Sequence, residues 1–196
     1  MYYYVVKYVG HFGFIKPWTA VRDEETFSQQ FLTPSTVEGM EKKLFPELLD
    51  RPGRHKILRH RINFLGLVSQ QERTWSKGGF KVWKAKKQWK TNLGVITRSV
   101  LLEPHLYLAF GRADDADRAR HQHLCLCRNE DLLLPEEDVR KLTPAQFDRN
   151  LVGFELLFDG DPAAMFKVGH HRYQGGAEML GQLKSYGNPI RQNPLV

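Results

Sequence analysis

The sequence predicts an α+β fold in which an antiparallel sheet carries two helices and an inserted, strongly basic β-hairpin. Short runs rich in aromatic and β-branched residues alternate with period two, as strands do. One segment repeats apolar residues at helical spacing, and a lysine-rich stretch carries a glycine pair between two alternating runs. A chain of 196 residues is long enough to bury a core as a single domain without disulfides.

The N-terminal quarter contains the first strand and the first helix of this prediction. Residues 2–9 are aromatic and β-branched, which indicates a strand, and residues 10–18 form a glycine- and aromatic-rich loop. A helix is expected to begin at Ser35, whose side chain would form a capping box with Glu38 three residues later. Pro46 should end or kink this helix, whose apolar positions are Val37, Met40, Leu44 and Leu48.

The rest of the chain completes a ferredoxin-like (RRM-like) order of elements. We expect strands at 57–68, 95–110 (broken at Pro104), 121–128 and 151–158, a hairpin at 70–92 turning at Lys77-Gly78-Gly79, a charged loop at 111–120 and an acidic helix at 135–149. The order strand, helix, strand, hairpin, strand, strand, helix, strand fits one domain over residues 1–196, with the hairpin inserted at about 70–97. The tail from Met165 onward stays unassigned.

The positive charge of the chain is concentrated in one window. Residues 51–100 hold thirteen Lys or Arg against one acid, Glu72, so this window carries +12 while the other residues carry −5 of the total of +7. Such a block repels itself unless a polyanion neutralises it, which favours nucleic acid as the ligand. A well-solvated basic face and an anionic membrane surface remain the alternatives, although the window lacks a long amphipathic helical pattern.

Aromatic residues are interleaved with lysines in the predicted hairpin. Between Arg73 and Arg98 stand Trp75, Phe80, Trp83 and Trp89, separated by six lysines. Lysine and arginine hold phosphates, and exposed aromatic rings stack on unpaired bases for roughly 1–3 kcal/mol each. One or two of the tryptophans could instead pack the hairpin onto the body. The pattern predicts a grip on single-stranded or irregular RNA rather than DNA recognition by a helix.

The N-terminal third resembles the CRISPR-associated RAMP proteins, and most closely their fifth-numbered Cas family. The resemblance rests on Gly10, Gly13 and Phe14, on Pro17, and on residues 31–40 (FLTPSTVEGM), which are similar to that family's "TPSA-x-G" helix start with Thr36 in place of alanine. Residues 97–110 match the family's central strand loosely, and residues 166–187 correspond to its C-terminal glycine-rich segment. The resemblance implies a ferredoxin-like fold with a protruding hairpin thumb.

The same resemblance implies a non-catalytic subunit that binds the 5′ handle of the guide RNA (crRNA) in a Cascade effector complex. It implies partners among the backbone and large Cas subunits, with target DNA contacted indirectly. No cofactor and no metal are expected. The residues expected to contact RNA come from the basic window, the glycine loop and the helix start: His11, Lys16, Ser35, Arg59, Arg61, Arg73, Trp75, Lys77, Lys81, Trp83, Lys84, Lys86, Lys87, Trp89, Lys90 and Arg98.

Two other functions stay open. One branch of the resembled family cleaves precursor guide RNA without a metal, which requires a general base and a cation near the scissile phosphate. That branch has a tyrosine ahead of the first helix, where this chain has Phe27 and Phe31; His11, His55 and His60 could serve instead. The other alternative is a generic RNA-binding module outside CRISPR.

Two clusters that contain histidines lie in the second half of the chain. If residues 121–127 form a strand, His121, His123, Cys125 and Cys127 share one face. Same-side neighbours lie about 7 Å apart, so the four span too far for one tetrahedral ion and no metal is expected. The polar run His170-His171-Arg172-Tyr173 could contact RNA or a partner. No apolar run suits a membrane span and the N-terminus does not read as a signal peptide, so a cytoplasmic protein is expected.

Overall fold

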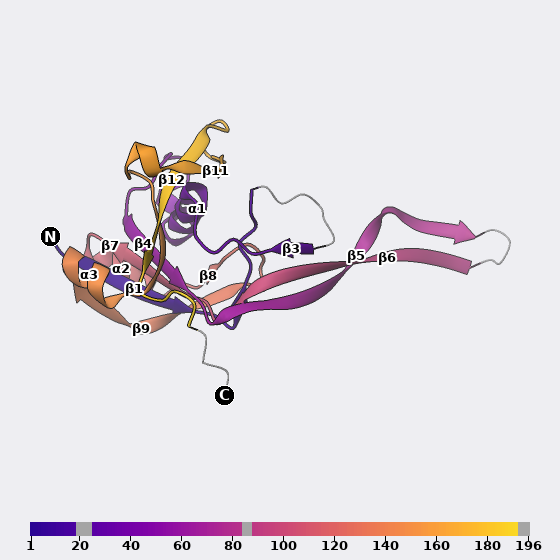
Figure 1. Cartoon of the computed structure of the whole chain (residues 1–196), viewed down its shortest axis with the longest axis horizontal. Helices are drawn as coiled ribbons and strands as arrows, with labels where there is room; N and C mark the ends of the chain where they lie inside the picture. Colours follow the sequence, from indigo (N-terminus) through magenta and orange to yellow (C-terminus); the bar gives the residue numbers. More distant parts are fainter. Residues whose placement is uncertain (19–24, 84–87, 192–196) are drawn as a thin grey trace.

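The computed structural model describes residues 1–18, 25–83 and 88–191 and confirms the ferredoxin-like α+β fold. Its central unit runs strand–helix–strand, strand–helix–strand, and the four strands lie in the antiparallel order β4-β7-β1-β9. The elements of this unit are β1 (Tyr3–Val9), α1 (Pro34–Leu44), β4 (Ile57–Asn63), β7 (His105–Phe110), α2 (Ala113–Ala119) and β9 (Leu132–Leu142). Figure 1 shows this body with a long hairpin projecting from it.

The sheet is widened at both edges to eight strands. At the β4 edge, the C-terminal part of the chain adds β10 (Gly153–Leu157), β12 (Glu178–Tyr186) and β11 (Phe166–His170); at the β9 edge, β8 (Leu124–Cys125) adds one short strand. The last strong strand was predicted, and it is β10. The tail that the sequence left unassigned therefore forms the β11–β12 hairpin.

The inserted hairpin consists of β5 (Gly66–Trp83) and β6 (Gln88–Leu102), which pair antiparallel along their length. The predicted turn at Lys77-Gly78-Gly79 is wrong, because pairing resumes beyond it. The register shifts between Trp75 and Phe80, so the glycine pair sits in a bulge. Two short strands brace the base of β6, namely β2 (Phe12–Gly13) antiparallel and β3 (Glu25–Phe27) parallel to it.

Helix α1 begins two residues earlier than predicted. Thr33 is its N-cap, with its Oγ1 accepting a hydrogen bond from the Thr36 amide at 3.3 Å, and Pro34 occupies the first turn. Ser35 therefore lies inside the helix and the expected capping box is absent there. The helix ends at Leu44, and Pro46 opens the short 3₁₀ helix η1 (Pro46–Leu48), as its ring requires.

The two faces of the sheet are covered by different helices. On the α1 and α2 side, the main core packs Val37, Met40 and Leu44 against alternate strand residues such as Val6 and Leu108. On the opposite side, Phe147 of α3 (Pro144–Asn150) and Leu151, which caps that helix, pack with the strand residues that alternate with these, namely Val5, Tyr107 and Ala109. Period-two alternation in the central strands thus supplies two cores.

Three local predictions were wrong in the region 111–149. Residues 113–119 form α2, whose buried positions are only the small Ala116 and Ala119, so its charges hid the helical pattern. In place of the helix expected at 135–149, the structure has β9 followed by α3. The backbone hydrogen bonds of β9 are made with β1, while many of its side chains face solvent. Of the strand expected at 121–128, only Leu124–Cys125 pairs.

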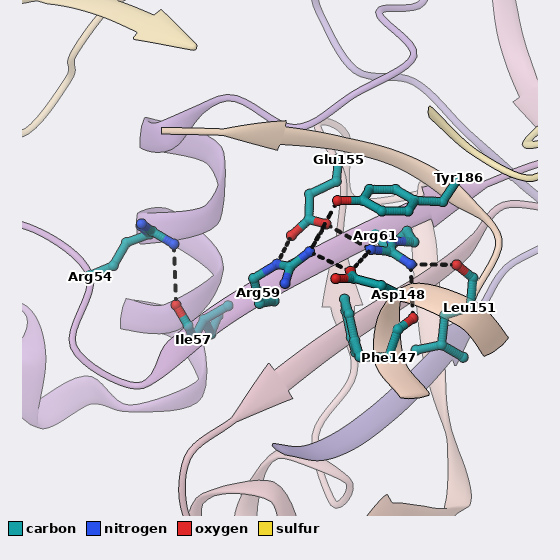
Figure 2. A network of polar contacts seen from close by, with 9 residues as sticks. All are labelled: Arg54, Ile57, Arg59, Arg61, Phe147, Asp148, Leu151, Glu155 and Tyr186. Atoms are coloured by element: carbon teal, nitrogen blue, oxygen red, sulfur yellow. Dashed lines mark hydrogen bonds and ion pairs between the residues drawn. The ribbon is translucent and has the colours of Figure 1, made fainter. Parts of the chain in front are cut away.

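Arg59 and Arg61 lie in a buried ion cluster rather than on an RNA-facing surface. The Arg61 guanidinium is fully buried and donates to the carbonyls of Phe147 at 2.9 Å and Leu151 at 2.5 Å, and to Glu155 at 2.9 Å. Arg59 donates to Glu155 at 2.5 Å and 2.7 Å (Figure 2). The sequence-based assignment of both residues to RNA is therefore corrected: they join β4 to α3 and β10.

Two further residues complete the ion cluster. Asp148 accepts from Arg59 at 2.9 Å and from Arg61 at 3.0 Å, and the Tyr186 ring lies 3.6 Å from the Arg61 guanidinium carbon. Burial opposes ionisation of Glu155, but its hydrogen bonds and charge interactions with the arginines outweigh this and lower its pKa. The C-terminal strands are thus fastened to the ferredoxin-like unit by charge-assisted hydrogen bonds.

Replacing Glu155 with glutamine should destabilise the fold by about 3–5 kcal/mol at pH 7, because it leaves the buried guanidinium of Arg61 with only the half-exposed Asp148 as a charged partner. Since the pKa of Glu155 is lowered on folding, its contribution is present above the ordinary value of 4.5 and lost as the pH falls below it. Urea denaturation of the wild type, E155Q and the exposed control E137Q at pH 7 and pH 3.5 measures both effects. A loss under 1 kcal/mol at pH 7 would contradict the role of the cluster.

Candidate nucleic-acid interface

The predicted RNA-contacting residues of the basic window are distributed along the projecting hairpin. Trp75, Lys77, Lys81 and Trp83 belong to β5, and Trp89 and Lys90 to β6; Lys84, Lys86 and Lys87 lie outside the described residues. The register places Lys81 opposite Lys90. The paired strands thus carry these basic and aromatic residues along the arm, and their contact with RNA stays a prediction.

The base of the hairpin holds the only acid of the basic window. Glu72 on β5 accepts from Arg98 Nε on β6 at 3.1 Å and also from Arg128, which belongs to the loop after β8. Arg98 was expected to contact RNA. It pairs with this carboxylate at the base of the hairpin, and its contact with RNA stays a prediction. Arg73, beside Glu72, is exposed.

A cavity of about 440 Å³ lies beside α1, and we call it the α1 pocket. It brings together two sequence-predicted residues, Lys16 of the glycine loop and Ser35 of the helix start. Lys43 of α1 and the tail residues Arg172 and Tyr173 also line it. Of the described residues that form its wall, none is Asp or Glu. Three cations and several hydroxyl groups without an acid make this pocket suited to an anion such as a phosphate.

A buried cluster fixes the tail against α1 and so shapes the α1 pocket. Glu38 lies 2.9 Å from Lys42 Nζ and 3.3 Å from His171 Nε2, and all three side chains are nearly inaccessible. The His171 ring in turn accepts from the Tyr173 amide at 3.2 Å, and Lys42 sits 4.2 Å from the centre of the Tyr173 ring. The run His170–Tyr173 is therefore tied to the first helix, which its spacing in the sequence did not indicate.

The glycines of the N-terminal loop serve packing. A Cβ on Gly13 would lie 2.4 Å from Leu126 Cδ1, and one on Gly10 would lie 2.6 Å from the Leu132 carbonyl oxygen. Protein atoms therefore already occupy the space beside these two glycines. His11 lies in this loop, away from the α1 pocket, and lines an apolar recess of about 320 Å³ with Val9, Phe12, Leu132 and Leu134.

The histidines considered as catalytic bases lie in unlike environments. His60 is buried, its ring stacks on Phe158 with centroids 5.2 Å apart, and its Nε2 has no hydrogen-bond partner among the described residues. Burial lowers the pKa of His60 to about 4, so its ring is neutral at pH 7 and inaccessible to RNA. His55 is exposed and its Nε2 lies 3.1 Å from the Pro52 carbonyl oxygen.

The His/Cys run at 121–127 does not converge on one point. Cys125 and Cys127 line the α1 pocket, whereas His121 lies 3.9 Å from Asp117 of α2. Within the described part of the chain, no three His, Cys, Asp or Glu side chains gather as a metal site. Over the same residues, no helix has the length and apolar character that crossing a membrane requires.

Comparison with solved structures finds the same fold in a chain of a "CRISPR RNA-guided surveillance complex". The two chains superpose with a TM-score of 0.55 at 12% sequence identity, over 96% of this chain and 90% of that one. No protein-family model matches the sequence, and no curated protein matches it either. The likeness thus lies in the fold, which extends over nearly the whole of both chains.

Nuclear magnetic resonance should show the His60 imidazole neutral down to about pH 5, with a pKa near 4 instead of the ordinary 6.5. Because the unfolded chain binds this proton more readily, the free energy of unfolding should fall as the pH drops from 6.5 towards 4. A His60 ring that titrates near 6.5 would contradict its burial. The titration follows the ring resonances that disappear in His60→Gln.

Proposed function

We propose that this protein is a non-catalytic guide-RNA-binding subunit of a CRISPR–Cas effector complex. In this role it holds the 5′ handle of the crRNA, caps the backbone of the complex and contacts neighbouring Cas subunits. One observation supports the proposal: the chain carries a basic hairpin arm and an acid-free α1 pocket. Both belong to a fold that is shared with a chain of a CRISPR RNA-guided surveillance complex.

The physical argument starts from charge and shape. Lysines along the arm provide sequence-independent phosphate contacts, and the interleaved tryptophans provide stacking platforms for unpaired bases. The α1 pocket adds three cations at the body, which suits a single phosphate group. An arm and a pocket on one chain suit a single RNA strand that passes from one to the other. The likeness in fold favours guide RNA over other RNA as that strand.

A metal-independent endoribonuclease is the second candidate, and one structural observation favours it. Residues 9–33, just ahead of α1, contain no tyrosine, but the tail brings Tyr173 to that helix, where it lines the α1 pocket with Lys16 and Lys43. A tyrosine hydroxyl beside two ammonium groups is chemically able to support attack of a 2′-OH on a phosphate. Cleavage lost in Y173F, with binding retained, would establish this activity.

Purified protein mixed with labelled CRISPR repeat RNA in EDTA should shift the RNA in a gel without cutting it. A scrambled RNA of equal length should bind more weakly. A discrete cut at one position would overturn the non-catalytic role. Equal affinity for both RNAs, by a stable monomer, would instead indicate a general RNA-binding module.

Removing cations from either part of the interface should weaken binding and reduce its dependence on salt. Each lost phosphate contact lowers the slope of log affinity against log salt by about 0.7 for single strands. We expect K16A/R172A in the α1 pocket and K81A/K90A on the arm each to reduce the slope by about 1.4. The matched control is R149A on α3, which covers the other face of the sheet. Fluorescence anisotropy at four salt concentrations measures the slopes; unchanged slopes for both pairs would contradict the assignment.

A further inference from the structure

The loop at residues 126–131 joins the two parts of the interface. On one side, Leu126, Cys127 and Asn129 form part of the wall of the α1 pocket. On the other side, Arg128 reaches the hairpin, where it donates to Glu72 and, at 3.1 Å, to Gln70 Oε1. The same loop therefore touches both the pocket and the base of the arm.

The loop is itself rigidly built around a buried carboxylate. Asp131 is fully buried, accepts from the Arg128 amide at 2.8 Å and from Arg128 Nη2 at 2.7 Å. Its backbone carbonyl also accepts from the Leu126 amide at 3.1 Å. The Arg128 guanidinium therefore bridges two carboxylates, with Nε and Nη2 donating to Asp131 in its own loop and Nη1 donating to Glu72 on β5. A planar guanidinium with several donors suits this bridging position better than a flexible ammonium.

Glu72 contacts both the opposite strand of the hairpin and the loop at residues 126–131. Its two carboxylate oxygens accept from Arg98 on β6 and from Arg128, and its side chain is only 27% exposed. In a segment otherwise selected for positive charge, one acid would weaken RNA binding if it faced the strand. Its pairing with two arginines removes that cost and indicates a role inside the protein.

We propose that Glu72, Arg98 and Arg128 form a clamp that holds the hairpin at a fixed angle to the α1 pocket, so that one RNA strand engages both. The proposal rests on the proposed RNA-binding function. From Glu72 to Trp83 the arm extends about 26 Å, because their partners Ile96 and Gln88 on the unbulged strand β6 are eight residues apart at about 3.3 Å per residue. A swing of about 10° at the clamp moves its tip by about 4.5 Å, which exceeds the reach of a hydrogen bond of about 3 Å.

The benefit of the clamp follows from effective concentration. Once a strand is bound at one part, a fixed second part meets it as an intramolecular partner, whereas a swinging arm spreads over many positions. Glu72 and Arg128 are thus positioning residues that raise the affinity for long RNA while contacting none. A short RNA that fills one part alone gains nothing from the clamp.

Distances between spin labels measure the clamp directly, without RNA. Labels on T91C in β6 and D114C in α2, in a C125S/C127S background, report the position of the arm relative to the body. We expect a narrow distance distribution that broadens at least twofold in E72Q and in R128M. R128K should restore part of the narrow width. The matched control is R120M, which removes an exposed ion pair with Asp117 on the body. Equal widths in the wild type, E72Q and R128M would overturn the proposal.

Affinity for RNA of two lengths separates the clamp from the proposed function. We expect E72Q and R128M to bind repeat RNA about tenfold more weakly and a four-nucleotide RNA with unchanged affinity. Equal losses for both lengths would overturn the positioning role. If the wild type binds neither RNA, the proposed function fails while the distance measurement still decides the clamp. Circular dichroism confirms folding, and R98M supplies the test where R128M does not fold.

Discussion

The pairing of β4 with β7 is the constraint on which the architecture depends. These strands are antiparallel neighbours, so the chain between them leaves and re-enters the sheet at one end. The intervening residues fold back on themselves as β5 and β6, outside the sheet, and β2, β3 and Arg128 hold their base. The most basic part of the sequence is thereby carried on an arm that needs no core of its own (Figure 1).

The basic window places part of its positive charge in ion pairs with the protein's own carboxylates and part along the arm. Arg59 and Arg61 pair with carboxylates inside the protein, where a planar guanidinium can bind several acceptors at once (Figure 2). Arg98 pairs with Glu72 at the base of the hairpin. The lysines follow one another along the arm, where a flexible, hydrated ammonium suits phosphates of variable position. Net charge alone therefore overstates how much of the window is free of partners within the protein, because these three arginines are paired with carboxylates.

The sequence was sufficient for elements whose own side chains determine them. Strand β1, helix α1 and strand β10 follow from local periodicity, and the hairpin follows from its charge and length. The sequence-based predictions were wrong where tertiary contacts determine the secondary structure. Strand β9 is polar because much of it faces solvent, and α2 buries only alanines. Of the residues that line the α1 pocket, Lys16 and Ser35 were singled out from the sequence, whereas Lys43 and Tyr173 were not. Contacts between residues about ninety to one hundred and thirty positions apart leave no local signal, and Tyr173 is held at α1 by His171 and by Lys42.

Hydrogen–deuterium exchange with and without repeat RNA would show whether one RNA contacts both the arm and the α1 pocket, because it reports on every backbone segment at once. If RNA binds at both parts, exchange slows along β5 and β6 and in the two pocket segments, residues 124–131 and 171–173, within one complex. Exchange in α3 and β10 should stay unchanged, since they lie in the second core and the ion cluster. Protection confined to the face covered by α3, with none on the arm or at the pocket, would contradict RNA binding at the arm and the α1 pocket.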